Sequence, residues 1–422
     1  MHSLVDNATV DSVPESQPAR RSIAADLDGL RQLSTNAVML TTRLVEAEHS
    51  RLDWFSRSRN VEADRMGGIA GMVYGTIYAI NGLVGTGLGI LVSQMAPFLG
   101  DSAPSATRES ALAILNGVIG DYLYKEANPL AISMQFRVDG IPQNDDMLLR
   151  RINQSNGKLL LLVHGSCMND LQWSQEGHDH GTALAMDSNF TPVYVNYNSG
   201  LHISQNGKLL ASHLNRLAGL FSEEQPLTLH VLAHSMGGLV VRSSCHYAAS
   251  ETDQFNSNDW LGQLQKVVFL GTPHHGALLE RGGKWIDYLL ALHPYSEPFS
   301  WLGKIRSMGV ADLGYGNVRD EDWQDCGSTH GSTDCRLPTP LPSDVQCYAI
   351  AAITSDQSNY FRDKVVGDGL VTEDSALGKN HSNPDLNLSI PPSHQKTIRN
   401  IGHVGLLNSL EVYAAIRSFL DN

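Results

Sequence analysis

Residues 227–244 read LTLHVLAHSMGGLVVRSS, and they carry the clearest indication of the fold. Its first half is apolar and β-branched, which predicts a strand, and its second half predicts a helix. Ser235 stands at the turn between them, with the small residues Ala233 and Gly237 two positions before and after it. Larger side chains there would clash with the crossing backbone, and the helix N-terminus directs free N–H groups at the turn. We therefore expect Ser235 to be a nucleophile; the alternative is an ordinary turn with a serine helix cap.

A second predicted strand, LLLLV, ends in HGS at residues 164–166. Where a serine nucleophile sits in such a turn, the N–H after it and an N–H from an earlier strand–helix loop hold the oxyanion. We predict the backbone N–H groups of Ser166 and Met236 as these donors. His164 comes before the serine in the chain, and we expect it to brace the loop through a hydrogen bond rather than to act as a base.

The acid of a serine triad should follow a later strand than the nucleophile. VVGDGLV places Asp368 between two glycines, after a predicted strand at 345–353. A Gly-Asp-Gly turn is tight and can present the carboxylate at the edge of a sheet. Asp368 is the predicted acid, with Asp356 and Asp363 as its rivals and a plain surface turn as the alternative.

The base should come last, just before a final helix. RNIGHVGLL offers His403 in this position, whereas His394 and His381 lie in polar loops with no helix after them. The resulting chain order of Ser235, Asp368 and His403 is the order found in α/β sheets with a strand–serine–helix turn, and it differs from the trypsin and subtilisin orders.

Beyond residue 126 the predicted strands and helices alternate, which indicates an α/β fold with a mostly parallel sheet covered by helices on both faces. No internal repeat is visible. Strands are expected at 132–138, 158–164, 192–198, 227–234, 266–271 and 345–353, and helices at 202–221, 236–250 and 404–420.

Five motifs occur along the chain in the order HGS, AHSMGG, GTPHHGA, GDGLV and GHVGLL. Together they resemble bacterial lipases and esterases, and the related lipase-like hydrolases that deacylate the inositol of GPI anchors. The resemblance covers about residues 158–410. It implies an α/β-hydrolase catalytic domain over 126–422, the triad roles given above and hydrolysis of carboxylic esters without a cofactor or metal.

The chain before this domain is of a different kind. Residues 1–22 are polar and interrupted by prolines, which predicts disorder. Residues 23–125 predict a helical N-terminal extension, with its last helix at 107–124. Within it, residues 66–100 carry no charge and nine glycines. Because glycine dilutes their apolar content, we expect them to dock on the protein or to attach peripherally to a membrane or granule rather than to span a bilayer.

An insertion at about 276–343 separates two predicted strands where a short connection would suffice. Its many apolar residues predict a helical lid or cap that lines an acyl pocket or packs on the sheet. The pair His274–His275 precedes it and is expected to be structural. His178 and His180 flank one aspartate but lack a clear third metal ligand, and we see no carboxylate cluster for calcium.

Composition limits the classes of partner. The 422 residues include 30 Lys and Arg against 44 Asp and Glu, for a net charge of −14. Such an acidic chain is a poor nucleic-acid binder. The N-terminus has no secretory signal, so we expect a cytoplasmic location, with free thiols as the default and a Cys326–Cys335 bridge as the alternative.

These observations favour a lipase or esterase acting on acyl esters of lipids. A polyhydroxyalkanoate-type polyester depolymerase would use the same triad, with the apolar segment 66–100 on the granule. A catalytically idle hydrolase-fold module that binds lipid or protein is the alternative from another class, and the intact set of Ser235, Asp368 and His403 argues against it.

Overall fold

An eight-stranded sheet forms the centre of the described part of the protein, with the strand order β2-β1-β4-β3-β5-β6-β7-β8. The computed structural model describes residues 24–36, 106–251, 259–277, 307–324, 334, 336–355 and 367–421. β1 pairs antiparallel with β2 and β4, and every other pairing is parallel. The strands are β1 Gln135–Val138, β2 Ile141–Pro142, β3 Lys158–Val163, β4 Thr191–Asn196, β5 Thr228–His234, β6 Leu264–Leu270, β7 Gln346–Ile353 and β8 Gln395–Arg399.

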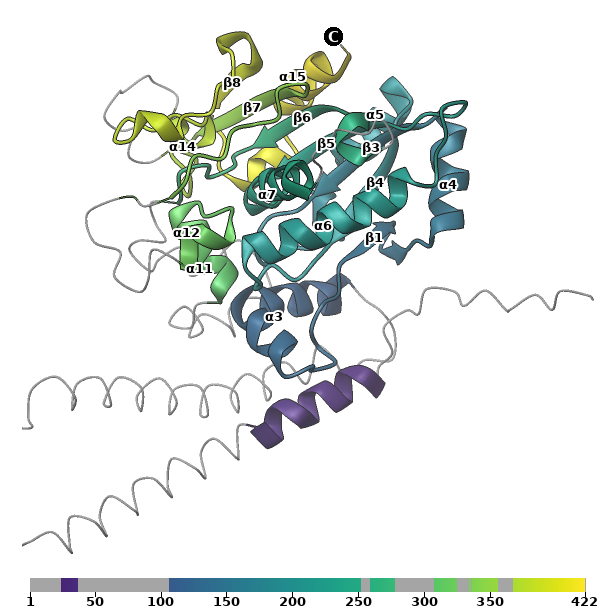
Figure 1. Cartoon of the computed structure of the whole chain (residues 1–422). Coiled ribbons are helices and arrows are strands. Elements are labelled where there is room, and N and C mark those ends of the chain that lie inside the picture. Colours follow the sequence, from purple (N-terminus) through teal and green to yellow (C-terminus); the bar gives the residue numbers. More distant parts are fainter. Residues whose placement is uncertain are drawn as a thin grey trace, which may run out of the picture.

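Helices cover both faces of this sheet (Figure 1). They are α3 Ala106–Lys125, α4 Asp145–Gln154, α5 His180–Ser188, α6 Ile203–Ala218, α7 Met236–Glu251, α8 Trp260–Gln263, α11 Met308–Tyr315, α12 Asp320–Gln324, α14 Glu373–Ala376 and α15 Leu410–Asp421. Short 3₁₀ segments are η1 Asp170–Trp173, η3 Pro384–Leu386, η4 Pro392–His394 and η5 Val404–Leu407. The helix expected at 404–420 is thus η5 followed by α15.

The central strands are buried on both faces, which explains why they are continuous apolar runs. In β3, Leu159 and Leu161 belong to the core shared with α6 and α7, while Leu160 and Leu162 belong to the core shared with α15. All four side chains are fully buried. Successive side chains of a strand point to opposite faces, so one run of leucines supplies two cores.

The N-terminal helices pack against the sheet domain. α3 is the helix expected at 107–124, with bounds that differ by one residue at each end. Its residues share the core of α6 and α7. Asn116 of α3 donates to the carbonyl of Leu130 and accepts from the N–H of Ile132, both at 2.8–2.9 Å. A helix at residues 24–36 joins α3 through a buried ion pair between Asp26 and Arg108.

Several expectations fall outside the described residues. These are the disorder of 1–22, the segment 66–100, most of the insertion at 276–343, and the thiols of Cys326 and Cys335. Among the helices that the structure describes, none has the length and apolar character needed to cross a bilayer. Within the insertion, α11 and α12 are described, and Ser307 at the start of α11 donates to the carbonyl of Gly117 on α3. Cys167, Cys245 and Cys347 are free and buried.

Candidate active site

Ser235 occupies the turn between β5 and α7, as the sequence predicts, and it adopts the left-handed conformation with φ of 55°. This conformation is uncommon for a residue with a side chain, and it persists where the surrounding structure enforces it. The Ser235 N–H donates to the carbonyl of Leu270 at the end of β6. A Cβ at Gly237 would lie 2.4 Å from the Val163 carbonyl oxygen and 2.6 Å from that of His164. Only glycine fits there, which is why the motif needs a small residue two positions after the serine.

The loop after β3 lies directly beside this turn. A Cβ placed on Gly165 would be 3.0 Å from the Cβ of Ser235, so the two segments are in contact. Ser166 is buried in the same loop. Met236 is the first residue of α7, and the first N–H groups of a helix have no acceptor within it. Met236 therefore follows Ser235 directly, and Ser166 follows Gly165 in the loop that contacts the turn.

Asp368 and His403 are brought together from two different loops. The Nδ1 atom of His403 lies 2.6 Å from Oδ2 of Asp368, and each side chain is only 1% exposed. The other carboxylate oxygen accepts from the N–H groups of Leu370 at 2.9 Å and Val371 at 2.8 Å. The backbone also contributes, since the His403 N–H donates to the Asp368 carbonyl at 3.1 Å. These bonds fix the carboxylate and the imidazole relative to each other.

The free nitrogen of His403 is the one that a general base would use. Asp368 engages Nδ1, whereas the buried Nε2 has no hydrogen-bond partner among the described residues. Gly271, after β6, lies beneath this pair with φ of 55°, and a Cβ there would be 3.2 Å from both Asp368 Oδ2 and His403 Cε1. Ser235 itself is buried, with 3% of its surface exposed.

The rivals of these residues have other roles or lie outside the described residues. His394 stacks on Tyr348 with ring centroids 4.2 Å apart, and His381 pairs with Asp374 at the surface. Asp356 and Asp363 both lie outside the described residues.

His164 braces the loop after β3, as expected from the sequence. Its Nδ1 lies 2.7 Å from the Gly165 carbonyl oxygen, and its ring stacks on Tyr197 at 4.3 Å. Tyr197 also donates to the His164 carbonyl at 2.9 Å. Burial lowers the pKa of His164 to about 4, so the imidazole is neutral and cannot act as a cation near neutral pH.

The other histidine pairs lie among neighbouring groups of the protein. His178 and His180 bond to each other at 2.8 Å, and His180 Nε2 bonds to the Leu406 carbonyl at 2.9 Å. His274 is fully buried beside Phe269. No group of three or more histidine, cysteine or carboxylate side chains suited to a metal occurs in the described ranges.

One residue near the site was not singled out by the sequence analysis. His234 directly precedes Ser235, and its Nε2 lies 3.2 Å from the carbonyl oxygen of His403. The alternation of side chains along a strand could have indicated it. His234 is two residues after Leu232, so the two side chains share the face toward the last helix, opposite Ala233. Its hydrogen-bond partner, the carbonyl of His403, is 169 positions away in the chain and could not be inferred from this alternation.

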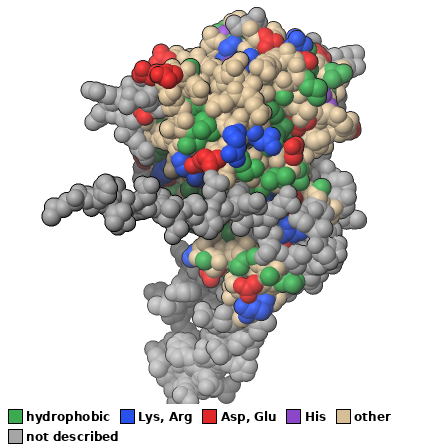
Figure 2. All heavy atoms as spheres, turned by 90° about the vertical axis from the view of Figure 1, so that its right-hand side faces the viewer, with side chains coloured by type: hydrophobic (Ala, Val, Ile, Leu, Met, Phe, Trp, Pro, Cys, Tyr) green, Lys and Arg blue, Asp and Glu red, His purple; other side chains and the backbone are tan. Residues whose placement is uncertain are grey.

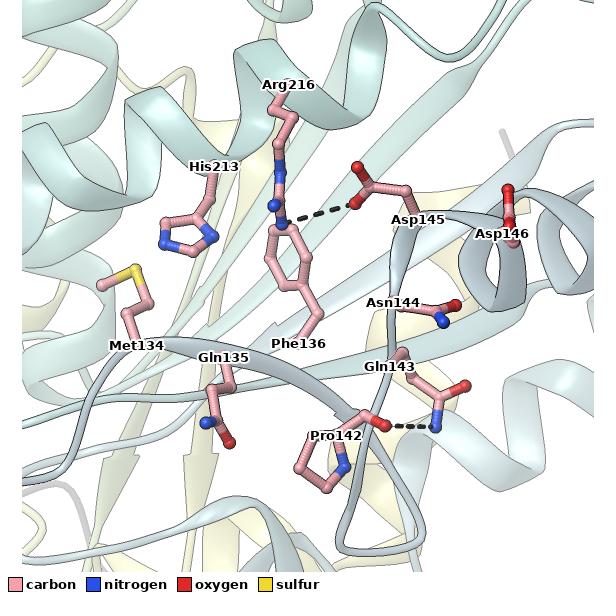
Figure 3. Close-up of a pocket in the computed structure, with 10 residues that line it drawn as sticks. All are labelled: Met134, Gln135, Phe136, Pro142, Gln143, Asn144, Asp145, Asp146, His213 and Arg216. Atoms are coloured by element: carbon pink, nitrogen blue, oxygen red, sulfur yellow. Dashed lines mark hydrogen bonds and ion pairs between the residues drawn. The ribbon is translucent and has the colours of Figure 1, made fainter. Parts of the chain in front are cut away.

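A cavity of about 470 Å³ lies at the β1 edge of the sheet and is lined by neither Ser235, Asp368 nor His403 (Figure 3). Phe136 and Pro142 form part of its wall, while Arg216 of α6 reaches across it to Asp145 at 3.4 Å. On the described part of the face that Figure 2 shows, acidic and basic side chains are interspersed in small groups.

The sheet order, the strand–serine–helix turn and the placement of Asp368 and His403 after β7 and β8 define an α/β-hydrolase fold. The model of a domain of unknown function, DUF7379, matches residues 133–308. Comparison with curated proteins gives no match.

Solved structures that are similar to this chain include three lipases or esterases. Bacillus licheniformis lipase BlEst2 in mature form is 17% identical with a TM-score of 0.39, over 63% of this chain and 91% of that one. EstA from Clostridium botulinum is 14% identical with a TM-score of 0.39, over 63% of this chain and 87% of EstA. The Pyrococcus furiosus esterase Pf2001 is 11% identical with a TM-score of 0.34, over 63% of this chain and 80% of the esterase.

Proposed function

We propose that this protein is a serine hydrolase that cleaves carboxylic esters, with Ser235, Asp368 and His403 as its triad. The observation that carries the proposal is the 2.6 Å bond between Asp368 and His403, buried beside a serine in a left-handed strand–helix turn. A buried Asp–His pair that leaves Nε2 free is the arrangement that activates a serine.

In the proposed mechanism, His403 Nε2 takes the proton of Ser235 Oγ as the oxygen attacks the ester carbonyl carbon. Asp368 orients the imidazole and stabilises the imidazolium that forms. The backbone N–H groups of Ser166 and Met236 bind the tetrahedral oxyanion, each contributing about 3–4 kcal/mol to transition-state stabilisation. The imidazolium then protonates the leaving alcohol, and water repeats the attack on the acyl-enzyme.

Acyl esters of lipids are the substrate class that we propose. The apolar composition of the insertion at 276–343 supports an apolar acyl group over a polar one. Peripheral contact of segment 66–100 with a membrane or granule is part of the same proposal.

The test combines covalent labelling with turnover. A fluorophosphonate probe should label the full-length protein at Ser235, and the protein should hydrolyse p-nitrophenyl butyrate. Ser235→Ala should lose both, whereas Ser222→Ala, a surface change outside the site, should keep both. An active Ser235→Ala variant would exclude the triad.

A further inference from the structure

His234 connects the two sides of the candidate active site. It is the last residue of β5 and is 1% exposed. Its ring lies 4.7 Å from the ring of His403 at an interplanar angle of 44°, and Trp173 meets it edge-on at 6.3 Å. The ring is therefore held in a fixed place directly beside the imidazole that the proposed mechanism uses.

The hydrogen bond of His234 fixes its tautomer. Its Nε2 lies 3.2 Å from the His403 carbonyl oxygen, and a carbonyl oxygen can only accept, so Nε2 carries the proton and donates. Its Nδ1 is then an acceptor, and it has no hydrogen-bond partner among the described residues. Nδ1 faces the loop after β3, since a Cβ on Gly165 would lie 3.2 Å from it.

The ring stays neutral near neutral pH. Burial, and then the charge that His403 would carry, lower the pKa of His234 well below 6.5. A neutral neighbour matters because a second positive charge 4.7 Å from His403 would oppose protonation of His403 during turnover.

We propose that His234 is a positioning residue: it donates to the peptide carbonyl of His403 and so holds the imidazole at the distance that proton transfer from Ser235 requires. The inference rests on the proposed function. Asp368 secures the N–H and the Nδ1 of His403, whereas His234 holds the carbonyl on the other side of the same residue. Without the bond from His234, the carbonyl of His403 can rotate while the two bonds from His403 to Asp368 stay in place.

The predicted consequence appears in kcat. A displacement of about 1 Å at a reacting group costs about 100-fold in rate. His234→Leu removes the donor, and we expect kcat for p-nitrophenyl butyrate to fall about 10- to 100-fold while KM changes less than about 2-fold. The rate of fluorophosphonate labelling should fall in parallel, because it also needs an activated Ser235.

Conservative variants separate positioning from packing. The amide nitrogen of a glutamine reaches the place of Nε2, whereas that of an asparagine reaches the place of Nδ1. His234→Gln should therefore keep a kcat at least about 5-fold above that of His234→Asn. This comparison remains decisive if His234→Leu does not fold, which circular dichroism would reveal.

His230 supplies the matched control. It lies on the same strand and the same face, is 5% exposed, and contacts Phe190 rather than His403. His230→Leu should keep kcat near the wild-type value. Equal losses in His230→Leu and His234→Leu, a wild-type kcat in His234→Leu, or equal kcat in the Gln and Asn variants would each overturn the inference. If Ser235→Ala is inactive in the same assay, such a result contradicts only the role of His234. If Ser235→Ala is active, both the proposed function and the role of His234 are wrong.

Discussion

The imidazole of His403 and the carboxylate of Asp368 are joined by a 2.6 Å hydrogen bond, although 35 positions separate them in the sequence. Two neighbouring N–H groups saturate the second carboxylate oxygen. The carboxylate therefore cannot turn away from the imidazole without breaking those bonds. This rigidity makes the pair suited to orienting a base, because the tautomer and the ring plane of His403 are both set.

Asp368→Asn should lower kcat by about three to four orders of magnitude, because an amide can stabilise the wrong tautomer of His403 and cannot stabilise its imidazolium. The pair Asp374–His381, which includes no residue of the proposed triad, offers a matched control, and Asp374→Asn should keep kcat within about 2-fold of the wild-type value. Initial rates on p-nitrophenyl butyrate measure both. A mild Asp368→Asn together with a crippling Asp356→Asn would assign the acid to Asp356 instead.

Ser166 is predicted to act through its backbone, so the side chain and the N–H can be tested separately. Ser166→Ala keeps the N–H and should lose less than about 5-fold in kcat. Ser166→Pro removes the backbone N–H, and kcat should fall about 100-fold or more. Steady-state kinetics on the two purified variants, with circular dichroism to check folding, gives the comparison. Similar activities in the two variants would exclude this N–H as an oxyanion donor.

Removing one partner of the ion pair between Arg108 and Asp26 should be strongly destabilising, because both side chains are buried and Nε lies 2.6 Å from the carboxylate. Arg108→Met leaves a buried carboxylate and should lower the free energy of unfolding by about 3–5 kcal/mol. Arg31→Met breaks the exposed pair with Asp28 and should cost less than about 1 kcal/mol. Urea unfolding measures both, and equal small losses would show that residues 24–36 do not dock on α3.

Stability should fall in mild acid because several buried histidines are neutral in the folded state. Burial lowers the pKa of His230 to about 4, as it does for His164 and His180. Between about pH 6.5 and 4 the unfolded chain binds more protons than the folded one, so the free energy of unfolding decreases as the pH falls.

His230→Leu removes one such group. The slope of the free energy of unfolding against pH in that window should decrease by up to about 1.4 kcal/mol per pH unit. Urea unfolding at pH 4.5, 5.5, 6.5 and 7.5 provides the slopes for wild type and variant. An unchanged slope in the variant would contradict the assignment of a neutral, buried His230.

The position of the candidate nucleophile and the α/β class could be predicted from the amino-acid sequence alone. The turn around Ser235 has strict local requirements, namely a strand before it, a helix after it and a residue without a Cβ at Gly237. Local requirements of this kind leave a readable pattern. Strands buried on both faces, such as β3, are equally readable because every residue of the run must be apolar.

Features that depend on contacts between distant segments became visible in the folded protein and not in the sequence pattern. The edge strand β8 has a single buried side chain, Ile398, so no periodic signal marks it, and its register comes from pairing with β7. The docking of α3 and the bond from His234 to the His403 carbonyl join residues that are far apart in the chain. Such contacts involve backbone carbonyls that every residue possesses, so the side-chain pattern cannot specify them, and they become fixed only when the packed sheet brings the loops at the ends of its strands to the same edge.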